Sequence, residues 1–183
     1  MKNERLIKAA FNRGFEYEKT YRGCAQCTVA AIQDTLGIRN DFVFKAAGGF
    51  AAGGGMLCDG VCGGYAGGIM MMSLFFGRRR NKFDDDRDEN YHSFHMAGAL
   101  RARFINEYGT ILCGAIHGKI FGRSFDLWNP EEKDQFEEAG AHADKCTTVV
   151  AQSSAWATEI ILQEIEKGDL DIRDFSYLIH LLE

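Results

Sequence analysis

Apolar residues recur at helical spacing along most of this chain. In the first segment Ile7, Ala10 and Phe11 lie on one face of a helix, whereas the alternation typical of strands is scarce throughout. The chain contains one proline, Pro130, and glycines separate the apolar segments. We therefore predict an all-α fold with helices over residues 3–19, 24–36, 42–47, 88–108, 130–139, 145–167 and 172–182.

Residues that commonly cap helices stand at several of the expected helix ends. Asp41 and Asp144 are the predicted N-caps of the helices that follow them. Asn129 stands before Pro130, a residue favoured in the first turn of a helix, and two glutamates follow. Gly37 is placed to end the second helix in a left-handed conformation.

A glycine-dense segment at residues 48–77 is the predicted centre of the fold. It holds more than half of the glycines, and its second half is apolar and lacks proline. Gly60, Gly64 and Gly68 recur at intervals of four, so a helix would align them in a ridge that another backbone can approach closely. We predict a buried, glycine-rich central helix that continues through residues 69–76 as a fully buried segment.

The same segment carries two cysteines, Cys58 and Cys62. They are four residues apart, which is about one helical turn, so a helix would place both thiols on one face. We expect them at the N-terminal end of the central helix, where the helix dipole favours thiolates.

Length and charge limit the class of protein. A chain of 183 residues predicts one domain, 1–183, and a net charge of -5 argues against binding to nucleic acid or to a membrane surface. The N-terminus lacks the apolar core of a secretory signal, and the apolar run at 69–76 is too short to span a bilayer. We expect a cytoplasmic protein, in which six cysteines indicate metal ligation or thiol chemistry rather than structural disulfides.

Four cysteine positions lie near the starts of separate predicted helices: Cys24, Cys58 or Cys62, Cys113, and Cys146. If these helix ends converge, four thiolates surround one point. An iron–sulfur cluster or a structural zinc ion needs such a set of ligands. The alternative for any single cysteine is a small buried apolar residue, which is less plausible for all six together.

Two further chemistries remain open. A thiol–disulfide oxidoreductase could act through Cys24 and Cys27, a C-x-x-C at a helix start, or through Cys58 and Cys62. A zinc-stabilised accessory subunit of a larger complex would use the thiols for structure alone. Neither cysteine pair is followed by the histidine of a c-type haem attachment motif.

The histidines carry weaker signals. His117 lies in segment 111–128, which we expect to form a short helix followed by an ordered loop, with His117 in that loop as a candidate metal ligand or proton shuttle. His92 and His95 lie three apart on a predicted helix, and we expect a solvated His92 and a hydrogen-bonded His95 without a special role.

These residues resemble the C_GCAxxG_C_C family of redox-active proteins over about residues 15–166. The resemblance rests on Gly23-Cys24-Ala25-Gln26, on Gly53-Gly54-Gly55, on Val61-Cys62-Gly63-Gly64-Tyr65-Ala66-Gly67, and on Cys113, Phe125-Asp126-Leu127 and Cys146. Where the family pattern has alanine after the cysteine and glycine, this chain has Gly64. Segment 117–122 is similar to a branch related to the non-haem part of split-Soret cytochromes, without the haem-attachment part.

The resemblance implies a set of ligands and a cofactor. It assigns the four characteristic cysteines to Cys24, Cys62, Cys113 and Cys146, and it leaves Cys27 and Cys58 as additional thiols. Its split-Soret branch implies an iron–sulfur centre and a homodimer. For the cluster we favour the 2Fe–2S type. We therefore expect an electron-transfer protein that works with a redox partner protein; the resemblance supplies no substrate and no reaction.

Overall fold

The computed structural model describes residues 2–84 and 87–168, and it confirms the predicted all-α fold for this part of the chain. The α-helices are α1 (Lys2–Tyr21), α2 (Cys24–Leu36), α3 (Asp41–Ala46), α4 (Gly63–Phe76), α5 (Arg87–Tyr108), α6 (Cys113–Phe121), α7 (Pro130–Glu138) and α8 (Cys146–Glu166). Short 3₁₀ segments span Ala47–Gly53 and Arg80–Lys82, and a π-helical turn spans Ala141–Lys145. The helix predicted at 172–182 lies outside the described residues.

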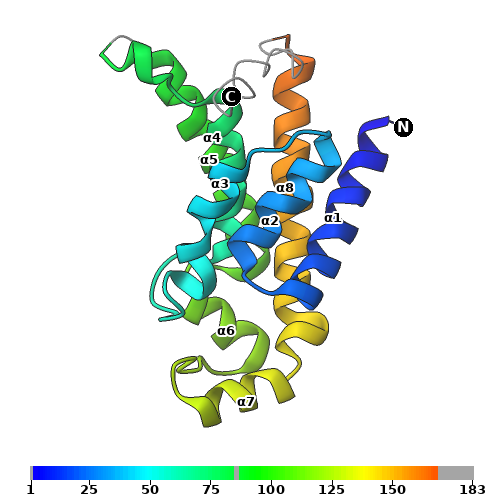
Figure 1. The fold of residues 1–183 in the computed structure, drawn as a ribbon, viewed down its shortest axis with the longest axis vertical. Helices are drawn as coiled ribbons and strands as arrows, with labels where there is room; N and C mark the ends of the chain where they lie inside the picture. The colour runs from blue at the N-terminus through cyan, green and yellow to red at the C-terminus, as the bar shows by residue number, and fades with distance from the viewer. Residues whose placement is uncertain (1, 85–86, 169–183) are drawn as a thin grey trace.

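The long helices form one bundle whose lower end, as drawn, gathers several helix starts. Figure 1 shows α2, α4 and α8 beginning at this end and running upward, while α1 and α5 run downward beside them. The short helices α6 and α7 lie at the same lower end (Figure 1). The N-terminal turns of α2, α4 and α8, which carry cysteines, therefore face one region of the molecule.

Helix α4 is the buried centre of the bundle, and its glycines allow it to pack closely on two sides. A Cβ atom at Gly67 would lie 2.5 Å from the carbonyl oxygen of Ala25 in α2. A Cβ atom at Gly68 would lie 2.7 Å from a methyl carbon of Leu100 in α5 and 3.3 Å from Ala157 in α8. The close helix packing predicted for these glycines is thus confirmed at Gly67 and Gly68.

The start of α4 differs from the prediction. The helix begins at Gly63, so Gly60 and Cys58 belong to the preceding loop and not to the helical ridge. Cys58 has a φ of 61°, which a right-handed helix cannot contain. The C-terminal half of α4 is also less buried than predicted, because Ile69, Met70 and Leu74 are only half-buried.

Two of the predicted caps are wrong, and two are confirmed. The N-cap of α3 is Asn40, whose side chain accepts a hydrogen bond from the Val43 N–H, while Asp41 pairs with an arginine. Asp144 lies within the π-helical turn and does not cap α8. Asn129 caps α7 through the backbone N–H groups of its first turn, and Gly37 ends α2 with a φ of 72°. No helix among residues 2–84 and 87–168 is long and apolar enough to cross a membrane.

Candidate metal centre

A cavity of about 170 Å³ lies at the lower end of the bundle. Cys24, Cys62, Cys113 and Cys146 all line it. Cys62 and Cys113 are buried and the other two are half-buried. The predicted convergence of helix starts is therefore present in the structure, although the role of these thiols as metal ligands stays a prediction.

Cys24 reaches the cavity because two glycines leave room for the chain around it. Gly23, with a φ of 90°, makes the turn between α1 and α2. A Cβ atom at Gly63 would lie only 2.2 Å from the Cys24 sulfur, so a side chain there would displace the thiol. The backbone N–H of Ala52 points at the same sulfur, with a nitrogen–sulfur distance of 3.4 Å.

Cys62 and Cys113 are brought together by backbone pairing between two segments that are far apart in sequence. The Cys62 N–H donates to the Ile111 carbonyl at 2.8 Å, and the Cys113 N–H donates to the Gly60 carbonyl at 2.9 Å. An isolated antiparallel bridge between Val61 and Leu112 lies between these bonds. This pairing lies at the end of the glycine loop, directly before α4 and α6, and it places the first residues of the two helices next to each other.

His117 lies among three of the thiols. It is on α6, one turn after Cys113, and not in the loop where the sequence analysis placed it. Its Nε2 atom lies 3.6 Å from the Cys113 sulfur and 3.9 Å from the Cys146 sulfur. Its Nδ1 atom lies 3.9 Å from the Cys58 sulfur. Ligand atoms of Cys58, Cys113 and His117 lie within 4.8 Å of one another, which is close enough to hold a metal ion.

Cys27 is not part of this group. Its thiol donates a hydrogen bond to the Arg22 carbonyl at 3.2 Å and does not line the cavity. The prediction that Cys58 and Cys62 share one helix face is wrong. Cys58 is in the loop, and Cys62 is the N-cap residue of α4.

A family model described as "Putative redox-active protein (C_GCAxxG_C_C)" matches residues 23–160, which is most of the chain. The chain belongs to this family. The match begins next to Cys24 and includes the other three cavity cysteines, so the family region contains the whole thiol set described above. Comparisons with curated proteins and with solved structures gave no match.

Burial governs the protonation of the thiols in this C_GCAxxG_C_C protein. It raises the pKa of Cys62 to about 11, although N–H groups of Tyr65 and Gly64 at the start of α4 act in the opposite direction. Burial also raises the pKa values of Cys24 and Cys146, with further contributions from neighbouring charges. The predicted acidification of thiols by the helix dipole is therefore outweighed by desolvation at these positions.

Cys58 and Cys113 behave as a pair. The hydrogen bond between the two thiols lowers the pKa of Cys58 and raises that of Cys113, and burial opposes the first effect and adds to the second. The nearby imidazole of His117 further lowers the pKa of Cys58. Cys58 is thus the cysteine of this pair that loses its proton more readily. It is not one of the four cysteines assigned by the family pattern.

The sequence indicated no role for two carboxylates and one imidazole of the cavity wall, those of Glu18, Glu137 and His142. Glu18 is only 3 % exposed, at the end of α1. It lies on the buried face of α1 with Ala10 and Gly14, because the three residues are spaced four apart. An acidic residue on the same helix face as two small residues was the sequence signal that could have indicated it. His142 is in the π-helical turn, whose position no sequence pattern indicated.

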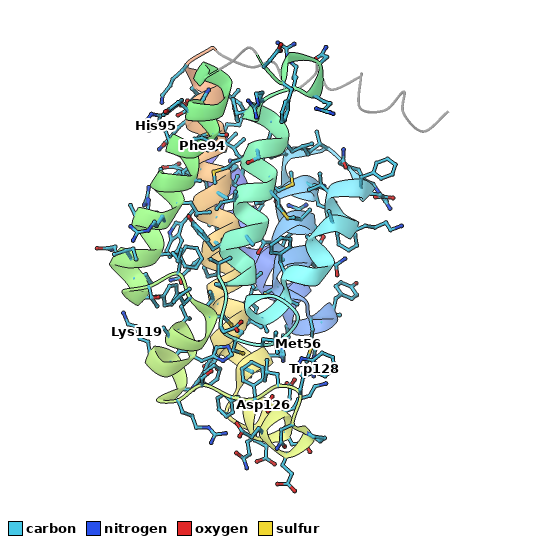
Figure 2. The ribbon with its side chains drawn as sticks, turned by 90° about the vertical axis from the view of Figure 1, so that its left-hand side faces the viewer. Met56, Phe94, His95, Lys119, Asp126 and Trp128 are labelled. Atoms are coloured by element: carbon cyan, nitrogen blue, oxygen red, sulfur yellow. The ribbon has the colours of Figure 1, made fainter. Side chains whose placement is uncertain are left out.

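His92 and His95, both on α5, lie away from the site. His92 lies 2.9 Å from a carboxylate oxygen of Glu164, and His95 is exposed, which is the reverse of the predicted assignment. In Figure 2, His95 and Phe94 are near the upper end of α5, whereas Met56 and Trp128 lie near the lower end of the bundle. The Trp128 indole there donates to the Gly55 carbonyl at 2.8 Å and ties the glycine loop to the segment before α7.

Proposed function

We propose that this protein binds an iron–sulfur cluster through Cys24, Cys62, Cys113 and Cys146 and uses it for electron transfer. The observation that supports this proposal is that all four thiols, from four separate helix starts, line one cavity. Four thiolates are the usual ligand set of such clusters. Membership of a redox-active family supports the same conclusion.

The cavity is compatible with such a group in its donors and in its space. Glycine at position 63 leaves room beside the Cys24 sulfur that any Cβ atom would fill. The Ala52 N–H points at the Cys24 sulfur, and N–H groups of Gly64 and Tyr65 act on the Cys62 sulfur. Hydrogen bonds to sulfur ligands are one means by which a protein tunes the reduction potential of a cluster.

A bound cluster would supply storage and transfer of single electrons. The chain itself holds the ligands in a site where Cys62 and Cys113 are buried, and it orients an N–H group toward the Cys24 sulfur. Because burial keeps Cys24, Cys62 and Cys146 protonated near neutral pH, ligand binding requires the release of their protons. In this proposal electrons are exchanged with a redox partner protein.

The test is anaerobic purification followed by iron and acid-labile sulfide analysis and a visible spectrum. We expect iron, sulfide and an absorption band that reduction bleaches. Cys24→Ser and Cys62→Ser should lose the cluster, whereas Cys27→Ser is a matched control that should keep it, because Cys27 faces the Arg22 carbonyl. Protein with neither iron nor sulfide would refute the proposal.

A second candidate is a single metal ion held by Cys58, Cys113 and His117, whose ligand atoms lie within 4.8 Å of one another. This set suits zinc, with a thiolate and imidazole donor group. Two further variants, compared with Cys24→Ser, separate the two candidates. Cys58→Ser and His117→Ala should remove a zinc ion at this site, whereas Cys24→Ser should not.

The thiol–disulfide alternative receives less support at Cys24 and Cys27 than at Cys58, whose pKa is lowered by its contacts with Cys113 and His117. The pair in α2 does not contain an acidic thiol, because burial raises the pKa of both Cys24 and Cys27. Metal-free protein that cycles reversibly between dithiol and disulfide would favour this alternative over both metal sites.

A further inference from the structure

Glu18 is a buried carboxylate in the wall of the thiol-lined cavity. One of its oxygens, Oε2, is fully buried and has no hydrogen-bond partner within the described part of the chain. Burial and the Glu18 carboxylate, which lies within reach of the Cys27 thiol, both raise the pKa of this thiol, but its hydrogen is directed to the Arg22 carbonyl at 3.2 Å. A buried carboxylate oxygen without a donor is costly, and such a cost commonly marks a functional group.

A chain of titratable groups connects Glu18 with the surface. The His142 Nε2 atom lies 3.6 Å from the Glu18 Oε1 atom, and its Nδ1 atom lies 2.9 Å from the Glu137 carboxylate. Exposure of the side chains rises outward along this chain, from 4 % for Glu18 to 15 % for His142 and 29 % for Glu137. Each ring nitrogen of His142 thus faces a carboxylate, an arrangement that can pass a proton from one to the other.

The charged and titratable groups around Glu18 come from every side of the cavity. They are Arg22 after α1, Cys24 and Cys27 of α2, Cys62 before α4, Cys113 and His117 of α6, Lys133 and Glu137 of α7, His142 of the π-helical turn, and Cys146 of α8. Arg22 pairs with Glu137 at 3.2 Å. Among the described residues, the His142 ring is the one basic side chain in an ion-pair contact with the Glu18 carboxylate.

A purely structural role would explain only part of this arrangement. An ion pair with His142 would join α1 to the π-helical turn through Glu18 Oε1. It would not explain why Oε2 is left without a donor in the wall of a cavity that also holds four thiols. Replacing such a group by an apolar one would remove the desolvation cost, so its presence favours a role in chemistry.

We infer that Glu18 takes up a proton when an electron enters the thiol-lined site, and that His142 and Glu137 carry this proton from solvent. The inference rests on the proposed function. The electron comes from a one-electron donor, and one proton from water converts the Glu18 carboxylate to the neutral acid, so the net charge of the cavity is unchanged. Oxidation releases the electron to an acceptor and the proton to solvent by the same route.

The physical reason is the Coulomb interaction between like charges in a poorly solvated site. Negative charge on Glu18 already opposes negative charge on the surrounding thiols, as its effect on Cys24 and Cys146 shows. An added electron increases this repulsion, and protonation of Glu18 removes it. Proton uptake at Glu18 therefore makes the reduction easier at low pH.

The test is a set of anaerobic redox titrations of the iron-loaded protein, followed by visible absorbance, between about pH 6 and pH 8.5. With one proton taken up per electron, the potential should fall by about 59 mV for each tenfold decrease in proton concentration. Glu18→Gln should make the potential nearly independent of pH. Glu138→Gln, an exposed acid on the same helix as Glu137, is the matched control and should keep the wild-type slope.

A second measurement does not depend on the folding of a variant. The infrared difference spectrum of wild-type protein, reduced minus oxidised, should show the carbonyl stretch of a newly protonated carboxylic acid. A wild-type potential independent of pH, an unchanged slope in Glu18→Gln, or no carboxylic acid band would overturn the inference while the cluster proposal stands. Protein without iron and sulfide would overturn both.

Discussion

Close packing between α2 and α4 makes a specific prediction about Gly67. The perturbation is Gly67→Ala, which adds one methyl group to the buried face of α4. Its Cβ atom would lie 2.5 Å from the Ala25 carbonyl oxygen, whereas ordinary contact begins at 3.4 Å. The two atoms would therefore have to move apart by about 0.9 Å. The Ala25 oxygen belongs to the backbone, so it cannot move away by a side-chain rotation. The new methyl group would also lie only 2.9 Å from the Cβ atom of Thr28.

The expected magnitude follows from two opposing effects. Overpacking of a well-packed core costs typically 1–3 kcal/mol, and a backbone clash belongs near the upper value, at about 3 kcal/mol. Alanine gains about 1 kcal/mol over glycine in a helix interior. The net loss of unfolding free energy is therefore about 2 kcal/mol, which lowers the melting temperature by roughly 4–8 °C for a chain of this size.

The assay is thermal and urea unfolding of metal-free protein, monitored by far-ultraviolet circular dichroism. Gly98→Ala on α5 is the matched control, because Gly98 is exposed and a Cβ atom there would meet nothing within 4 Å. It should gain up to about 1 kcal/mol. If Gly67→Ala were as stable as wild type while Gly98→Ala showed its gain, the close contact between α2 and α4 would be refuted.

Three further predictions concern protonation and the packing of α4. Burial raises the pKa of Cys62 to about 11, so zinc binding to the metal-free thiols should release protons and become tighter as pH rises. Calorimetry in buffers of different ionisation enthalpy measures the number of protons released. Zinc binding without proton release would contradict the prediction. Burial alone would lower the pKa of His142, but its carboxylate partners outweigh burial and raise it, so Glu137→Gln should lower the value seen by nuclear magnetic resonance. The stabilisation from a raised histidine pKa is complete below about pH 6.5 and is lost as pH rises through the folded value, so wild type should lose more stability than Glu137→Gln between about pH 5.5 and pH 8. Ser153→Ala should cost about 1 kcal/mol in urea unfolding, because the buried Ser153 hydroxyl donates to the Gly64 carbonyl at 2.7 Å; an unchanged midpoint would show that this bond adds nothing.

Sequence patterns located most helices because the signals are local. The range Cys24–Leu36 was predicted without error, since a cysteine-rich turn follows Gly23 and a glycine ends the apolar stripe. The N-terminal boundary of α7 was equally clear from Asn129 and Pro130. The N-cap of α3 was misplaced by one residue because asparagine and aspartate are adjacent and both can cap a helix.

The start of α4 could not be predicted from local patterns. Residues 58–62 read as a helical turn because Cys58 and Cys62 are four apart, yet the chain there pairs with residues 111–114. That pairing connects positions about fifty residues apart, and no periodicity in the segment itself encodes it. For the same reason His117 was expected in a loop, although it lies on the short helix that this pairing starts.

The amino-acid sequence by itself determined that this protein is all-α, where most helices run, and that Cys24, Cys62, Cys113 and Cys146 stand near helix starts, because helical periodicity and capping depend on neighbouring residues. Only the tertiary structure decided that these thiols share one cavity. It also decided that burial outweighs the helix dipole in their protonation and that Glu18 and His142 join them. Distances between separate helices and the desolvation of each group are properties of the packed bundle, so no local pattern contains them.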